Sequence, residues 1–269
     1  MTTADTVGTG TLVSDWREKP GSGMTVALCG TCINDTMFPQ TLKAVVTVLE
    51  RLGCAVEYPM AQTCCGQMFT NTGYFAEAMP TVRTYLEAFE GYDYIVGPSG
   101  SCVGSVREQH PMLAERSGDA RLVRRVSEIV THTYELSELL VDVLGVTDVA
   151  AYFPHRVTYH STCHSIRVAR VGDRPYRLLR AVQGIDLVPL VDSDQCCGFG
   201  GTFSVKNPDV SVAMGSDKAR HVMETGAQYV VAGDNSCLMH VGGLLHRMRS
   251  GVAPIHLAEI LANTAEEQS

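Results

Sequence analysis

The sequence contains little that would point to a membrane, a nucleic acid or an export pathway. It has one tryptophan in 269 residues, 7% aromatic residues and no apolar run long enough for a transmembrane helix. Its 21 basic residues are outnumbered by 29 acidic ones, which gives a formal net charge of −8, and the basic residues form no stripe. This balance argues against a general nucleic-acid-binding protein.

The N-terminal stretch and the glycine pattern exclude further classes. Residues 1–23 hold threonine, glycine, serine and charged residues without the apolar segment of a secretory signal, so we expect a lead-in segment and a cytoplasmic protein. No Walker A string or flavin fingerprint occurs. The string Gly198-Phe199-Gly200-Gly201 lacks the register of a dinucleotide-binding loop. It directly follows a cysteine pair, and its glycines favour close approach of the backbone to a metal cluster.

Cysteine is what the sequence does contain. Clustered cysteines in a reducing compartment indicate metal or redox chemistry rather than disulfides. Eight of the ten fall into two sets, each an adjacent pair followed by glycine, with one cysteine upstream and one downstream. The sets are Cys32, Cys64, Cys65 and Cys102, and Cys163, Cys196, Cys197 and Cys237. The intervening stretches are 31 and 36 residues in the first set, and 32 and 39 in the second. This spacing predicts two metal sites on a duplicated fold.

The pattern around the cysteines predicts an α/β protein in which strands alternate with helices. Expected strands are 24–28, 55–58, 94–97, 156–159, 187–190 and 229–232, and expected helices are 39–52, 74–89, 122–144, 175–182 and 211–225. Each half forms a small, mainly parallel sheet flanked by helices, in domains at 24–150 and 151–269. Because loops after parallel strands gather at the carboxyl edge of a sheet, the four cysteines of each half are expected to converge there.

Several other residues near these loops have a structural interpretation. Cys54, where a helix runs into a strand, and Cys29, which has no counterpart in the second half, are expected to be core thiols. His164 and His240 are expected to lie beside the second site without binding metal. A further group could pair with a carboxylate substrate, although ordinary surface roles are favoured. That group is His160, Arg167, Arg170 and Lys206.

The cysteine arrangement resembles the tandem cysteine-rich CCG domain known from heterodisulfide reductase and from the iron–sulfur component of glycolate oxidase. Finer strings resemble the lactate-utilisation protein A family most closely, over residues 24 to about 262. These strings are Gln62–Gln67, Asn71–Tyr74, Pro98–Cys102, Tyr159–His164, Cys196–Phe203 and Asp234–Met239.

The resemblance implies an iron–sulfur electron-transfer subunit of a cytoplasmic complex that oxidises L-lactate to pyruvate. Its partners would be a subunit with ferredoxin-like clusters and a third protein, and L-lactate itself is a candidate ligand. Heterodisulfide reductase has a fifth cysteine in each domain, where this chain has Ser99 and Asp234. Four thiolates suffice for one [4Fe–4S] cubane, so we expect one or two cubanes per chain, bound by the eight matched cysteines, rather than the noncubane form.

Three alternatives stay open. Zinc is compatible with four thiolates at one site, and a zinc-stabilised assembly module would transfer no electrons. Another CCG-type oxidoreductase would act on glycolate, glycerol 3-phosphate or a disulfide. A thiol redox sensor would need exposed cysteines of low pKa.

Overall fold

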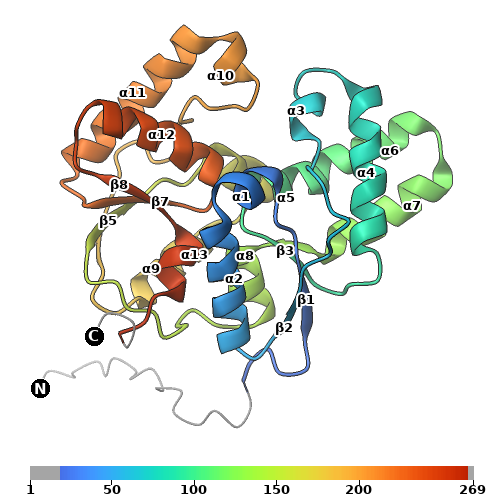
Figure 1. Ribbon diagram of the computed structural model, residues 1–269, viewed down its shortest axis with the longest axis horizontal. Coiled ribbons are helices and arrows are strands. Elements are labelled where there is room, and N and C mark those ends of the chain that lie inside the picture. Colours follow the sequence, from blue (N-terminus) through green and yellow to red (C-terminus); the bar gives the residue numbers. More distant parts are fainter. Residues whose placement is uncertain (1–18, 266–269) are drawn as a thin grey trace, which may run out of the picture.

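The structure is a computed structural model that describes residues 19–265, so residues 1–18 of the expected lead-in lie outside it. It contains two sheets of four parallel strands each (Figure 1). The first sheet has the order β2-β1-β3-β4 and the second β6-β5-β7-β8. The strands are β1 (Thr25–Leu28), β2 (Ala55–Glu57), β3 (Ile95–Gly97), β4 (Thr133–Glu135), β5 (Arg156–Tyr159), β6 (Asp186–Val188), β7 (Tyr229–Ala232) and β8 (Ala253–His256). The α/β class and the repeat of a parallel sheet are confirmed.

Helices connect the strands and cover the sheets. In the first half they are α1 (Cys32–Met37), α2 (Pro39–Arg51), α3 (Gln67–Thr70), α4 (Phe75–Phe89), α5 (Gly100–Gly104), α6 (His110–Ser117), α7 (Ala120–Ile129) and α8 (Leu136–Glu138). In the second half they are α9 (Arg174–Ala181), α10 (Phe203–Lys206), α11 (Pro208–Glu224), α12 (Asn235–Arg247) and α13 (Leu257–Ala262). Short π-helical segments follow α5 (η1, Ser105–Gln109), α8 (η3, Leu139–Val143) and Cys163 (η4, Ser165–Ala169), and a 3₁₀ turn follows α7 (η2, Val130–His132). Within residues 19–265, no helix combines the length and apolar character needed to cross a bilayer.

The helix expected over 122–144 was wrong. Helix α7 ends at Ile129, and the edge strand β4 follows before α8 begins. The apolar pattern continues across this break, which is why residues 122–144 resembled a single helix. Edge strand β8 was not anticipated either, because Pro254 lies within it. Proline is tolerated in a strand at the edge of a sheet, where its missing N–H is not needed.

The two halves share one hydrophobic core. Leu136 and Leu139, from α8 and η3, belong to the same buried cluster as Leu178 and Leu179 of α9. Arg51, at the end of α2, donates to the carbonyls of Val149 and Leu261 at 3.0 Å each and to that of Ala262. Figure 1 shows α2 and α13 side by side between the sheets. This packing holds the carboxyl edges of the two sheets in a fixed relation.

Glu135 gives the shared region a pH-dependent stability. Its buried carboxylate accepts from the Ser137 amide at 2.8 Å, and burial raises its pKa to about 7 from an ordinary 4.5. The folded protein therefore keeps a proton that the unfolded chain loses between these values. This contribution to stability is complete below about pH 4.5 and is lost as pH rises through about 7.

Glu135→Gln should flatten this dependence, because glutamine keeps an acceptor oxygen and carries no charge. At about pH 8 we expect the variant to match or exceed the wild type, by about 3 kcal/mol at most. Urea unfolding at about pH 5 and about pH 8 measures the difference. The exposed Glu108→Gln is the control. Equal pH slopes for wild type and Glu135→Gln would contradict this account.

Candidate metal centre

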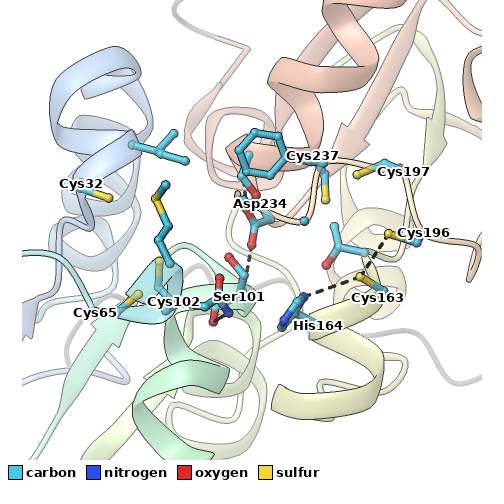
Figure 2. Close-up of a pocket in the computed structure, with 18 of the residues that line it drawn as sticks. Cys32, Cys65, Ser101, Cys102, Cys163, His164, Cys196, Cys197, Asp234 and Cys237 are labelled. Atoms are coloured by element: carbon cyan, nitrogen blue, oxygen red, sulfur yellow. Dashed lines mark hydrogen bonds between the residues drawn. The ribbon is translucent and has the colours of Figure 1, made fainter. Parts of the chain in front are cut away.

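Each cysteine of the two sets lies just beyond the carboxyl end of a strand. Cys32 begins α1 after β1, the pair Cys64 and Cys65 follows β2, and Cys102 lies in α5 after β3. The second half repeats this placement after β5, β6 and β7. All eight cysteines line one pocket between the halves, with a volume of about 130 Å³. Figure 2 shows Cys65 and Cys102 on one side of it and Cys163, Cys196, Cys197 and Cys237 on the other.

The four thiols of the first set form a continuous chain of contacts. The sulfurs of Cys32 and Cys64 are 3.7 Å apart, and the neighbouring Cys102 and Cys64 both raise the pKa of Cys65. The Gly66 amide donates to the Cys64 sulfur at 3.4 Å. Hydrogen bonds from Cys32 and Cys65, and then from this amide, lower the pKa of Cys64. Cys64 is therefore the preferred thiolate of the set, and thiolates are the form that binds metal.

The second set repeats this geometry. The sulfurs of Cys163 and Cys196 are 3.8 Å apart, and those of Cys197 and Cys237 lie within 4.8 Å of each other. The neighbouring Cys196 and Cys237 both raise the pKa of Cys197. The Gly198 amide donates to the Cys196 sulfur at 3.4 Å. The hydrogen bonds from Cys163 and Cys197 lower the pKa of Cys196 in the same way. The repeat thus extends from the sheets to individual sulfur contacts.

The glycine after each cysteine pair is required by the backbone. Gly66 has φ 80° and Gly198 has φ 90°, in the left-handed region that favours glycine. A Cβ atom on Gly66 would lie 2.2 Å from the Thr81 hydroxyl oxygen, and one on Gly198 would lie 2.5 Å from the Ser211 carbonyl oxygen. Glycine therefore lets the chain turn tightly enough for an amide to point back at the first sulfur of the pair.

Asp234 connects the two halves at the pocket, a role that the sequence did not reveal. Its buried carboxylate accepts from the Ser99 hydroxyl at 3.1 Å and from the Ser101 amide at 2.9 Å, both in the first half. It also accepts from the Ser236 amide at 3.1 Å, which caps α12. Figure 2 shows Asp234 and Ser101 between the two groups of cysteines. The two positions that lack a fifth cysteine therefore hydrogen-bond to each other.

The remaining residues singled out from the sequence have mixed outcomes. Cys54 is buried in the core, as expected. His164 lines the pocket, with Nδ1 3.6 Å from the Cys163 sulfur, whereas His240 donates through Nε2 to the Ser211 carbonyl at 3.3 Å. Of the described residues that line the pocket, none belongs to the group expected to pair with a carboxylate: His160, Arg167, Arg170 and Lys206.

Cys29 is a buried thiol, as expected, and the equivalent position of the second half holds a histidine instead of a cysteine. The Cys29 amide donates to the Val96 carbonyl at 2.8 Å, directly after β1. The His160 amide donates to the Val231 carbonyl at 2.8 Å, directly after β5. Since β3 and β7 occupy the same place in their sheets, Cys29 and His160 are equivalent positions. The position that holds a thiol in the first half thus holds an imidazole in the second.

Comparison with known proteins agrees with the repeated geometry. The cysteine-rich domain (CCG) family model matches residues 26–107 and 157–242. Lactate utilization protein A from Oceanobacillus iheyensis is 47% identical over 244 residues, covering 91% of this chain and 98% of that protein. The protein of that name from Exiguobacterium sp. is 45% identical over 238 residues, covering 88% and 96%. The chain belongs to the lactate utilization protein A family. The expected resemblance is therefore confirmed.

The fold of this family member also occurs in a solved structure of distant sequence. A hypothetical protein from Helicobacter pylori superposes with a TM-score of 0.60 at 12% identity, covering 91% of this chain and 49% of that chain. This chain thus corresponds to about half of the larger protein, and at that identity the likeness is one of fold alone.

The donor type suits a metal centre. Four cysteines from each half line the pocket, and soft thiolate ligands select iron–sulfur clusters and zinc. In the second half, a ring nitrogen of His160 and the sulfurs of Cys197 and Cys237 all lie within 4.8 Å of one another. All ten cysteines are free thiols, so none of these ligands is consumed by a disulfide.

Proposed function

We propose that this chain is the iron–sulfur electron-transfer subunit of a cytoplasmic system that oxidises L-lactate to pyruvate. The observation that carries the proposal is the convergence of eight cysteines, in two equivalent sets of four, on one pocket between the halves. The names of the lactate utilization protein A relatives support the lactate part.

In this proposal the chain's own residues hold two centres close together. Cys32, Cys64, Cys65 and Cys102 would bind the first, and Cys163, Cys196, Cys197 and Cys237 the second. When bound there, [4Fe–4S] clusters would supply reversible one-electron chemistry. The Gly66 and Gly198 amides donate to ligand sulfurs, and hydrogen bonds of this kind help set the reduction potential. Asp234 keeps the two loops in register across the pocket.

Reconstitution tests the substrate. The chain would be combined anaerobically with the two companion lactate-utilisation proteins and given L-lactate, glycolate, glycerol 3-phosphate or a disulfide with an artificial electron acceptor or donor. Turnover with L-lactate that disappears with Cys65→Ala or Cys197→Ala, and persists with Cys54→Ala, is the expected result. Turnover of another substrate in preference to L-lactate would move the chain to another CCG-type oxidoreductase.

A zinc-stabilised assembly module is the second candidate, and a distance favours it. Two thiolates on one tetrahedral zinc ion, with bonds of about 2.3 Å, lie about 3.8 Å apart. The sulfur pairs Cys32–Cys64 and Cys163–Cys196 are separated by 3.7 and 3.8 Å. A protein of this kind would be colourless, and its reduction would not affect turnover. Optical spectra recorded during the reconstitution would show whether the chain absorbs visible light and whether that absorption changes on reduction.

A further inference from the structure

The second centre has a nitrogen donor at the position where the first has sulfur. His160 and Cys29 follow equivalent strands, and their amides make the same 2.8 Å bond to the neighbouring strand. Cys29 is buried in the cluster that contains Cys65. His160 is 1% exposed and lies within 4.8 Å of the sulfurs of Cys197 and Cys237. At this equivalent position beside the cysteines, the first half therefore has a thiol and the second half an imidazole.

The hydrogen bonding of His160 leaves one nitrogen free to bind a metal. Its Nδ1 lies 3.3 Å from the Ser193 carbonyl oxygen. Because a carbonyl only accepts, Nδ1 carries the proton, and the Nε2 of the neutral ring has an unshared lone pair. This Nε2 is buried and has no hydrogen-bond partner among residues 19–265. A buried polar atom without a partner costs about 1–3 kcal/mol, so its retention next to two cysteines needs an explanation.

We propose that His160 Nε2 takes the place of one of the four cysteine sulfurs as a ligand of the metal in the second half, so that this centre has mixed nitrogen and sulfur ligation while the first has thiolates only. This inference rests on the proposed function, because it requires a metal in the second half. An Nδ1–H donated to a backbone carbonyl is the usual support of a metal-binding histidine, and it fixes the ring orientation. His221 and His256 also have a buried ring nitrogen without a partner among residues 19–265, but His160 is the described histidine whose ring nitrogen lies within 4.8 Å of two cysteine sulfurs. His240 donates its Nε2 to Ser211, and His164 lies beside Cys163 in the pocket wall.

Nitrogen ligation has a chemical consequence for the pair of centres. Replacement of cysteine by histidine at an iron–sulfur cluster raises its reduction potential, as in Rieske centres. The second centre should therefore be reduced at a higher potential than the first. The chain would then contain two distinguishable redox sites despite its internal repeat.

Pulsed EPR on protein labelled with ¹⁵N-histidine tests the ligand assignment. The Cys65→Ala background removes the metal of the first half, so that the reduced sample reports on the second centre alone. We expect a hyperfine coupling from a ¹⁵N nucleus bonded directly to the cluster. This coupling should disappear in His160→Cys, because that substitution introduces a softer sulfur donor and retains iron. The matched control His240→Asn should keep the coupling. Retention of the coupling in His160→Cys, or its absence from an iron-loaded wild type, would overturn the inference.

Metal analysis of the same samples separates this failure from failure of the proposed function. If the second half binds zinc, X-ray absorption at the zinc edge should detect a nitrogen ligand at about 2.0–2.1 Å that is replaced by sulfur in His160→Cys. An all-sulfur shell in the wild type would overturn the inference while leaving a metal centre in place. Wild-type protein without iron or zinc would overturn both, and this result is visible before any spectroscopy.

Discussion

Cys197→Ala is expected to remove the metal of the second half and leave the first centre loaded. Cys197 is fully buried and contacts both Cys196 and Cys237, so its loss breaks the chain of donors at its middle. If each half holds a cubane, iron should fall from about eight to about four per chain. Iron and acid-labile sulfide analysis of anaerobically purified protein measures this change.

The mirror-image substitution and a core thiol complete this test. Cys65→Ala should remove the metal of the first half only, and the double variant should lose nearly all of it. Cys54→Ala removes a thiol that is equally buried but lies in the hydrophobic core. It should therefore leave the metal content unchanged. Loss of metal from Cys54→Ala equal to that from Cys65→Ala would contradict the division into ligands and core thiols.

Asp234→Ala is expected to destabilise the protein by about 3 kcal/mol, because a helix cap and hydrogen bonds to a buried carboxylate are lost together. The substitution leaves the Ser101 amide and the Ser99 hydroxyl without this acceptor, and both belong to the other half. Because Cys102 directly follows Ser101, metal retention by the first centre should weaken as well. Urea unfolding and iron analysis measure the two effects separately.

The control for Asp234 is an acidic residue that also lies at a helix N-terminus. Asp209 is exposed in the first turn of α11, so Asp209→Ala should change stability by well under 1 kcal/mol. Asp234→Asn retains one acceptor oxygen and should fall between the two. If Asp234→Ala unfolded like Asp209→Ala, the connection between the halves would not depend on this carboxylate.

The sequence predicted the elements that carry the cysteines because their signals are local. A short apolar run, a loop with cysteine and then a helix recur at nearly constant offset, and parallel topology brings such loops together. Edge strands β4 and β8 escaped prediction for physical reasons. β4 continues the apolar pattern of α7, and β8 contains Pro254. In both segments the strand conformation therefore depends on pairing with the neighbouring strand.

The contacts across the pocket could not be predicted in the same way. The bond between Ser99 and Asp234 joins residues 135 apart in sequence, and it exists only because the core places the two sheet edges face to face. His160 is a different case. The offset of 131 that relates Cys32 to Cys163 also relates Cys29 to His160. The sequence therefore contains the signal for this equivalence, although the two residue types differ.

Metal analysis of the anaerobically purified wild type tests the central claim most directly. Iron, zinc and acid-labile sulfide per chain would be measured together with EPR of the reduced protein. Two cubanes predict about eight iron and about eight sulfide per chain, with an EPR signal on reduction. Zinc alone, with no signal after reconstitution with iron and sulfide, would contradict the electron-transfer role and leave the eight cysteines as a structural site.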